Sequence, residues 1–161
     1  SFFNKVFLIS IDITTCMKRI IDHLWISDYD SLKKKKDLIK NNFVVVNVAY
    51  EIENNFYDEK FELYDGTGPS PAKNKVVFLK AIDKVCELIN KKRNVVVHCQ
   101  AGVSRSVSVV LGVLVKKQVF GSYYDQNFKK LREIYPASLP APFFVSILLE
   151  NEWDSTLLNK N

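Results

Sequence analysis

Cys99 and Arg105 stand six positions apart, directly after a run of apolar residues. Residues 95–97 are all valine and predict a buried strand that ends just before the cysteine. The five intervening residues are enough to curl the backbone into a closed loop with its N–H groups inward. A helix beginning near Ser104 would turn its positive end to the same point. Arg105 adds a planar fork suited to two phosphate oxygens, so the segment predicts a binding loop for a phosphate-like anion.

The same loop predicts a nucleophile. Its positive field favours the thiolate form of Cys99, which attacks phosphorus. Gly102 suits a position where the backbone approaches the phosphate or adopts a positive φ. Ser106 is placed to hydrogen-bond the sulfur and to ease its departure when a phosphocysteine is hydrolysed. A single cysteine is more often an inert core residue, so this interpretation depends on the run from His98 to Ser106 occurring as a unit.

This run resembles the H-C-x-x-G-x-x-R-S signature of the dual-specificity protein phosphatases, in the cysteine-dependent protein tyrosine phosphatase superfamily. Its residues are His98, Cys99, Gln100, Ala101, Gly102, Val103, Ser104, Arg105 and Ser106. The resemblance implies that Cys99, Arg105 and Ser106 are catalytic, and that the stretch from Gln100 to Arg105 binds the substrate phosphate. It also implies that His98 orders the loop and supports the thiolate.

The resemblance extends over most of the chain. Residues 23–27 resemble the strand that opens the family's domain, 46–49 the exit of its second strand, and 61–65 the strand that leads into its acid loop. Two positions depart from the family's pattern. Ser27 stands where glycine is common, and the Pro-Ala-Pro sequence at 140–142 replaces the usual Pro-Asn before the last helix.

Cleavage of a phosphate ester also needs a proton for the leaving oxygen, and the family takes it from an aspartate upstream of the cysteine. Asp65 is the candidate, because it follows residues 61–64 and precedes Gly66. The loop from Gly66 to Asn74 is longer than is usual in the family. Asp65 as a simple turn residue before glycine is the alternative, and Asp58 is the reserve candidate for the acid.

The order of elements predicts an α/β fold, with a central, mostly parallel sheet of about five strands flanked by helices, as in the protein tyrosine phosphatases. The predicted segments are strands at 43–46 and 95–97, helices at 73–92 and 143–153, a helical stripe that Pro136 closes, and loops at 66–71 and 136–142. Residues 107–115 are rich in valine, which favours a strand. We nevertheless expect a buried helix there, because the segment follows the signature.

The substrate is inferred from the side chains inside the signature. Gln100, Ala101, Val103 and Ser104 are uncharged, whereas inositol lipid phosphatases typically place lysines there. RNA phosphatases of this kind usually have Asn before the arginine and Thr after it, where this chain has serines. We therefore expect a phosphoprotein substrate, in a pocket shallow enough for phospho-Ser, phospho-Thr and phospho-Tyr. The alternatives are an inositol lipid, an RNA 5′ phosphate, or a non-catalytic module that binds phosphoproteins.

Length and composition set wider bounds. The 161 residues, 47% hydrophobic and 25% charged, predict one domain over 1–161, and a fragment of a longer chain stays open because the first residue is Ser1. The net charge of +5 fits nucleic acid, a membrane surface or an anionic substrate and is too dispersed to decide among them, and we expect no nucleic acid partner. No apolar run reaches the length of a membrane span, and residues 2–11 predict a first strand instead of a signal peptide. We expect no metal and no other cofactor.

The remaining reactive and charged residues have structural interpretations. Three cysteines without metal-type spacing indicate free thiols in a reducing compartment, the cytoplasm or the nucleus. Cys86 is expected in the core, with a redox partner for Cys99 as the alternative for both it and Cys16. His23 is expected to be structural. Residues 33–36, four lysines in a row, predict the solvated side of an amphipathic helix, with a docking patch as the alternative.

Overall fold

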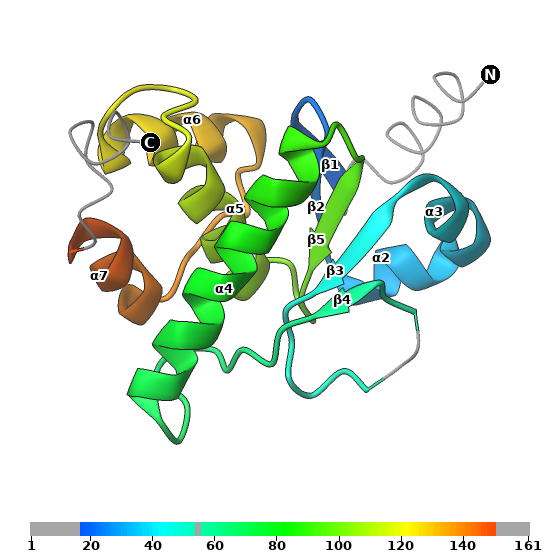
Figure 1. Cartoon of the computed structure of the whole chain (residues 1–161), viewed down its shortest axis with the longest axis horizontal. Coiled ribbons are helices and arrows are strands. Elements are labelled where there is room, and N and C mark those ends of the chain that lie inside the picture. The colour runs from blue at the N-terminus through cyan, green and yellow to red at the C-terminus, as the bar shows by residue number, and fades with distance from the viewer. Residues whose placement is uncertain (1–16, 54–55, 151–161) are drawn as a thin grey trace.

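The computed structural model describes residues 17–53 and 56–150 of the chain (Figure 1). Its sheet has five strands in the order β1-β2-β5-β3-β4. Their bounds are β1 Met17–Ile21, β2 Leu24–Ser27, β3 Val44–Asn47, β4 Glu59–Lys60 and β5 Val95–His98. β1 pairs with β2 antiparallel, and all other pairs are parallel. The predicted mostly parallel sheet is confirmed, with β5 at its centre.

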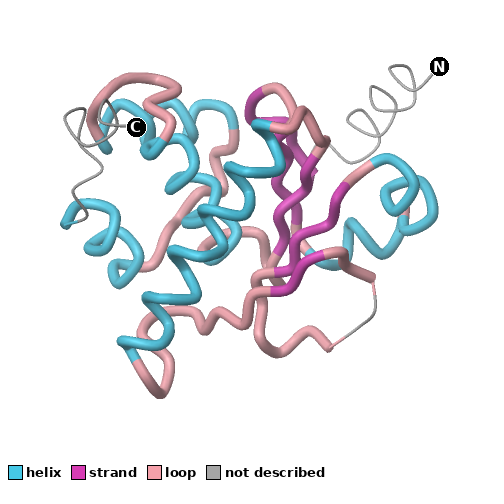
Figure 2. The backbone as a smooth tube through the Cα atoms, viewed as in Figure 1, coloured by secondary structure: helices cyan, strands magenta, loops and turns pink. Residues whose placement is uncertain are grey.

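Helices cover both faces of this sheet (Figures 1 and 2). On one side lie α4 Pro71–Asn90, α5 Arg105–Lys116, α6 Tyr124–Ile134 and α7 Pro142–Glu150. On the other side lie two short helices, α2 Tyr29–Lys34 and α3 Lys36–Asn42. The fold is therefore a three-layer α/β arrangement, as predicted.

The central strands show why both faces are covered. Val95 and Val97 of β5 pack into the core under α4 and α5, whereas Val96 packs into the smaller core under α2 and α3. Successive side chains of a strand point to opposite faces, so a strand buried on both sides reads as a continuous apolar run. All four residues of β5 are buried, which places Cys99 at the end of a rigid, central strand.

The valine-rich segment after the signature is the helix α5, as expected from its position and against its local propensity. Nearly all of α5 is buried, because α4, α6 and α7 surround it. Gly112 is needed for this packing, since a Cβ there would lie 2.3 Å from the Ile82 side chain of α4. Tertiary burial therefore outweighs the preference of β-branched residues for strands.

Several element bounds differ from the predictions. The helix expected at 73–92 runs two residues earlier, from Pro71, with Ser70 as its N-cap. The helix expected at 143–153 is α7, which the structure describes as far as Glu150. The predicted loops at 66–71 and 136–142 are irregular up to the first residues of α4 and α7. The strand expected at 2–11, and Cys16, lie outside the described residues.

One prediction about local structure is wrong, and a second is confirmed only in part. Residues 61–65 form no strand. β3 ends at Asn47, whose carbonyl accepts from the Phe61 N–H, and the chain then leaves the sheet. The lysines at 33–36 lie on the solvated side, as predicted, with only Lys35 partly buried, but they are divided between two helices. The helix α2 ends before Lys35, and α3 begins after it. No helix within the described part of the chain is long and apolar enough to cross a membrane.

Candidate active site

Residues 99–104, called the signature loop here, connect β5 to α5 at the carboxyl end of the parallel strands. Backbone hydrogen bonds from other segments fix this loop. Tyr29 N–H donates to Gln100 O at 3.1 Å, and Leu139 N–H donates to Val103 O at 2.9 Å. The loop forms one wall of an open cleft of about 680 Å³. The cleft is lined by Glu51, Asp65, Cys99, Gln100, Ala101, Val103, Ser104, Arg105, Leu139, Pro140, Ala141 and Pro142.

The Cys99 sulfur is almost fully buried at the inner end of this cleft, and only 2% of the residue is exposed. Its Sγ lies 3.2 Å from Ser106 Oγ and accepts from the Gly102 N–H at 3.3 Å. The helix α5 begins at Arg105, so its positive end faces the loop. The predicted association of Cys99, Gly102 and Ser106 is present.

Gly102 occupies a position that only glycine fits without strain. Its φ is +71°, and a Cβ would lie 2.9 Å from the backbone nitrogen of Asp28. The hydroxyl of Tyr135 donates to Gly102 O at 2.7 Å. This contact fixes the carbonyl group of Gly102, while the Gly102 N–H donates to the Cys99 sulfur. Tyr135 is the last residue of the predicted helical stripe that ends before Pro136. Its expected role was packing only, so this hydrogen bond was not predicted.

Arg105 is held by an acid that sequence reasoning missed. Its Nη1 donates to Glu51 Oε2 at 2.6 Å, and its Nη2 donates to Glu51 Oε1. Nη1 also donates to Leu63 O at 3.1 Å. This bidentate contact lowers the pKa of Glu51, because the carboxylate accepts from a charged donor. Burial opposes the charge of Arg105, but the hydrogen bond with Glu51 and the nearby Cys99 and Glu51 charges outweigh it and raise the pKa of Arg105.

The segment that carries Glu51 is tied to the end of β3. Asn47 accepts from Ala49 N–H at 2.9 Å and donates to Ile52 O at 3.0 Å, so its buried amide spans the turn. Glu51 itself has no sequence signal, because it lies in an irregular stretch and no fixed spacing connects it to Arg105. Only the fold brings the two together.

Asp65 lies in the same cleft as Cys99, as the sequence predicted. Ser104 Oγ donates to Asp65 Oδ1 at 2.7 Å and accepts from Ala141 N–H at 3.0 Å. The carboxyl group is thus attached to the signature loop by one of that loop's own side chains. We call residues 65–70 the acid loop.

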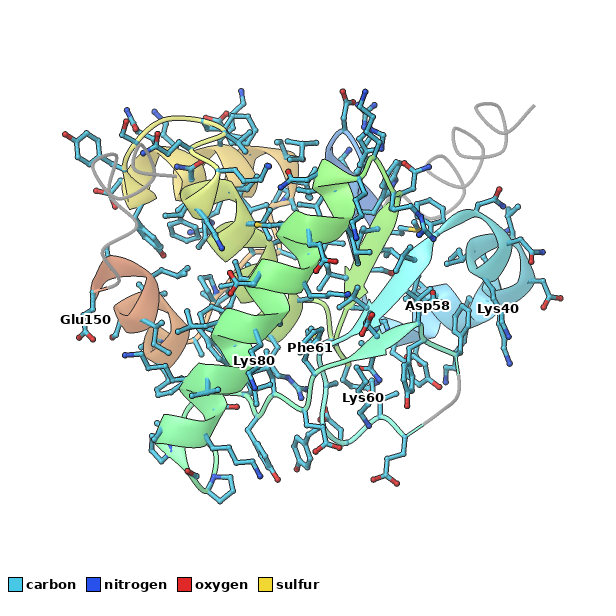
Figure 3. All side chains as sticks on the ribbon, in the orientation of Figure 1. Lys40, Asp58, Lys60, Phe61, Lys80 and Glu150 are labelled. Atoms are coloured by element: carbon cyan, nitrogen blue, oxygen red, sulfur yellow. The ribbon has the colours of Figure 1, made fainter. Side chains whose placement is uncertain are left out.

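The reserve candidate, Asp58, does not line this cleft. Its carboxylate accepts from Val45 N–H at 2.8 Å, and its own N–H donates to Val45 O at 2.9 Å. Asp58 therefore continues the pairing of the chain with β3, on the same side of the molecule as Lys40 (Figure 3). Its role is structural.

His98 is fully buried behind the loop and stacks on Tyr29, with ring centroids 5.6 Å apart. Its Nδ1 lies 3.2 Å from Cys99 O, so the ring braces the peptide that follows the strand. Burial lowers the pKa of His98 to about 4, despite the opposing effects of this hydrogen bond and of Asp28. The ring is therefore neutral near pH 7, and its contribution to the loop comes from shape and hydrogen bonding.

The two other predicted structural residues are where the sequence suggested. His23 forms the turn between β1 and β2 with a φ of +71°, and its Nδ1 lies 3.0 Å from Asn94 Oδ1. Cys86 is buried in the main core on α4, and burial raises the pKa of its thiol. Neither residue lines the cleft.

The arrangement brings together the groups that a phosphoryl transfer needs. A buried thiol accepts from the Gly102 N–H near a helix N-terminus, an arginine held by Glu51 lines the same cleft, and so does the carboxyl group of Asp65. Within residues 17–53 and 56–150, no group of three His, Cys, Asp or Glu side chains is arranged to hold a metal ion.

Comparison with known proteins agrees with this site. Residues 24–154 match the family described as "Dual specificity phosphatase, catalytic domain", and the chain therefore belongs to that family. The chain is 28% identical over 130 residues to the dual specificity protein phosphatase YVH1 of Plasmodium falciparum, covering 80% of this chain and 21% of that protein. It is 30% identical over 105 residues to mouse dual specificity protein phosphatase 19, covering 65% of this chain and 47% of that protein. The chain thus spans less than half the length of these relatives.

Solved structures show the same fold. A mouse putative dual specificity phosphatase, crystallised with zinc tungstate, superposes with a TM-score of 0.71 at 16% identity and covers 91% of both chains. The structure of a leucine-rich repeat and phosphatase domain protein from Entamoeba histolytica gives a TM-score of 0.66 at 18% identity and covers 91% of this chain and 92% of that one. The architecture is therefore kept where most of the sequence has changed.

Proposed function

We propose that this domain is a cysteine-dependent phosphatase that hydrolyses phosphate esters on proteins. The observation that carries the proposal is the common cleft of Cys99, Arg105 and Asp65, with the Cys99 sulfur held by Ser106 and by the Gly102 N–H. An anion cradle with an arginine binds phosphate. A thiol at its base and a carboxyl group at its rim add a nucleophile and an acid.

In the first step, the Cys99 thiolate attacks phosphorus in line with the leaving oxygen. The S–P bond forms, the P–O bond to the substrate breaks, and Asp65 gives its proton to the departing oxygen. The loop N–H groups and Arg105 stabilise the equatorial phosphate oxygens throughout. The product is a phosphocysteine and a free serine, threonine or tyrosine hydroxyl.

In the second step, water attacks the phosphocysteine. Asp65, now a carboxylate, takes a proton from the water, the new P–O bond forms and the S–P bond breaks. Ser106 hydrogen-bonds the departing sulfur and so stabilises the thiolate. Inorganic phosphate leaves and the starting state of the site returns. The thiol must stay reduced between cycles, which supports our inference of a cytoplasmic or nuclear location.

The protein substrate is supported by the chemistry of the cleft wall. Gln100, Ala101, Val103 and Ser104 carry no charge, so the signature loop itself offers no cationic side chain, and the cation beside it is Arg105, the first residue of α5. A ligand with several phosphates, such as an inositol phosphate or a 5′-triphosphate RNA end, would leave its further charges without a cationic partner there. A single phosphate on a peptide matches the site better.

The central test is turnover without metal. The recombinant domain is expected to hydrolyse an aryl phosphate in the presence of EDTA, and the Cys99→Ser variant is expected to have no measurable activity. The matched control is Cys86→Ser, since Cys86 is also buried but lies in the core on α4. Activity retained in Cys99→Ser, or lost equally in Cys86→Ser, would overturn the assignment of the nucleophile.

A substrate panel separates the alternatives. Phosphopeptides, inositol phosphates and 5′-triphosphate RNA are compared at equal concentration in one buffer, and the highest kcat/KM is expected for phosphopeptides. A higher value for one of the other two would reassign the substrate class. If this protein binds phosphopeptides but releases no phosphate, it is the non-catalytic module instead of an enzyme.

A solved structure with a similar fold carries a name of that kind. It is a human tyrosine phosphatase-like serine/threonine/tyrosine-interacting protein, with a TM-score of 0.68 at 22% identity.

A further inference from the structure

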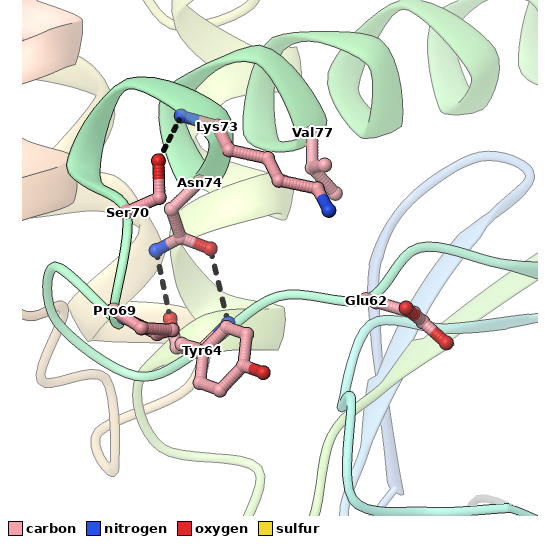
Figure 4. A pocket seen from close by; sticks show the side chains of 7 residues that line it. All are labelled: Glu62, Tyr64, Pro69, Ser70, Lys73, Asn74 and Val77. Atoms are coloured by element: carbon pink, nitrogen blue, oxygen red, sulfur yellow. Dashed lines mark hydrogen bonds between the residues drawn. The ribbon is translucent and has the colours of Figure 1, made fainter.

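A buried asparagine connects the acid loop to helix α4. Asn74 lies in the first turns of α4 and is only 3% exposed. Its Oδ1 accepts from Tyr64 N–H at 3.0 Å, and its Nδ2 donates to Tyr64 O at 3.1 Å and to Gly66 O at 2.7 Å. Figure 4 shows the amide between the helix and the backbone of Tyr64. One side chain therefore holds the backbone on both sides of Asp65.

The position of Asn74 on its helix is unusual for a polar residue. It precedes Phe78 by one turn and lies on the stripe of α4 that faces the core, with Ala81, Ile82 and Val85 further along. A polar side chain on such a stripe costs free energy unless its groups are hydrogen-bonded. Here the Oδ1 and both N–H groups of Asn74 have backbone partners, so the amide is satisfied by Tyr64 and Gly66, the two neighbours of Asp65.

The space beside the Asn74 side chain is not fully packed. A hollow of about 240 Å³ lies there, between residues 62–64 and the first turns of α4 (Figure 4). It is lined by Glu62, Tyr64, Pro69, Ser70, Lys73, Asn74 and Val77. The space between the acid loop and the helix is therefore only partly filled by side chains, and Gly66 has a φ of +79°.

We propose that Asn74 is a positioning residue that sets the place of Asp65 in the cleft, an inference that rests on the proposed role of Asp65 as the acid. Ser104 holds the end of the carboxyl group, and Asn74 holds the backbone from which that group projects. A displaced acid transfers its proton poorly, because general acid catalysis requires hydrogen-bond distance to the leaving oxygen.

The chain supplies a matched control at another loop. Asn127 of α6 is also buried and makes the same three bonds. Its Oδ1 accepts from Phe120 N–H at 3.1 Å, and its Nδ2 donates to Gly121 O at 3.0 Å and Tyr123 O at 2.9 Å. Neither Asn127 nor its partners line the cleft. Replacing either asparagine by alanine removes equivalent hydrogen bonds, but only Asn74 is connected to the acid.

The test measures the dependence of kcat/KM on the leaving group. Esters with poor leaving groups, such as an alkyl phosphate, need the acid, whereas an activated aryl phosphate barely does. Asn74→Ala is expected to lower the ratio of alkyl to aryl kcat/KM by about tenfold. Asn127→Ala is expected to leave the ratio unchanged, although both variants lose stability. Asn74→Ser is the second variant if the alanine substitution prevents folding.

A double-mutant comparison removes the remaining ambiguity. In the Asp65→Asn background the acid is absent, so Asn74→Ala is expected to change the ratio no further. An unchanged ratio in Asn74→Ala with Asp65 intact, or an equal fall in Asn127→Ala, would overturn the proposal. If Asp65→Asn itself leaves the ratio unchanged, the fault lies in the proposed role of Asp65. If the unaltered protein releases no phosphate from any ester, the proposed function fails, and with it this inference.

Discussion

The signature loop and the acid loop meet at the same cleft, but they are held in different ways. The signature loop follows a fully buried strand, continues into a buried helix, and accepts backbone hydrogen bonds from two other segments. The acid loop follows an irregular stretch, and a side chain of α4 and the hydroxyl of Ser104 hold it. The first loop is rigid because of where it lies in the core, whereas the second depends on a few individual hydrogen bonds.

The largest effect is expected at the signature loop, in Arg105→Lys. A lysine cannot reproduce the planar fork that holds Glu51 and faces the phosphate, so kcat/KM is expected to fall by about a thousandfold. Arg132→Lys is the control, because that guanidinium lies over Phe128, on a helix whose residues do not line the cleft. Comparable losses in both variants would show that the fork at Arg105 is not specifically required.

At the acid loop, Asp65→Asn is expected to lower kcat/KM for an alkyl phosphate by about a hundredfold and to change it little for an activated aryl phosphate. The amide keeps the size of the side chain and can still accept from Ser104, so the loop should stay in place. Steady-state rates on the two esters measure the difference. An equal loss on both would mean that Asp65 supports the structure of the cleft instead of donating a proton.

Substitution of one glycine in each loop compares the two loops directly. Gly102 and Gly66 both have a positive φ, but a Cβ at Gly102 would lie 2.9 Å from Asp28 N, whereas a Cβ at Gly66 would meet nothing within 4 Å. Gly102→Ala is therefore expected to lower kcat/KM by about tenfold or more, and Gly66→Ala to have only the smaller effect of backbone strain. A larger loss in Gly66→Ala would show that the acid loop is the more rigid of the two.

The smallest effect concerns His98, which braces the signature loop. Its pKa is lowered to about 4 in the folded protein, so between about pH 6.5 and 4 the unfolded chain binds a proton that the folded chain does not. The free energy of unfolding is therefore expected to decrease as the pH is lowered through this window, by up to about 3 kcal/mol. The contribution of the neutral His98 to stability is complete above about pH 6.5.

Urea unfolding between about pH 7.5 and about pH 5 measures this change, and His98→Asn is expected to show a shallower dependence on pH. This pH range excludes the titration of Glu51. The pKa of Glu51 is lowered from 4.5, so its contribution to stability is lost only as the pH falls below 4.5. Equal slopes for the two proteins would contradict a buried, neutral His98.

The difference between the loops also explains what the sequence could predict. The signature loop is encoded locally, and the roles of Cys99, Gly102 and Ser106 depend on fixed spacings within one segment. The identity of α5 as a helix followed from its place after that segment, although its valines favour strands. Such features are visible in a single stretch of chain.

The acid loop and its surroundings are encoded by distant residues. Glu51 meets Arg105 across 54 positions, and no local pattern connects them. The strand predicted at 61–65 is absent because β3 ends at Asn47, so its last backbone hydrogen bond with this segment is the one from the Phe61 N–H. One feature of the sequence could have pointed to Asn74: it is a polar residue one turn before Phe78 on an otherwise apolar stripe. Its hydrogen-bond partners could not be predicted, because they depend on the path of the acid loop.

The most direct test of the account is to trap the phosphorylated protein. Asp65→Asn is mixed with an activated aryl phosphate and quenched in acid within one turnover, so that an intermediate that needs Asp65 for hydrolysis accumulates. Mass spectrometry is expected to find one phosphoryl group on the peptide that contains Cys99, attached to its sulfur. A phosphoryl group on Ser106, or release of the aryl alcohol with no modified peptide, would contradict Cys99 as the nucleophile.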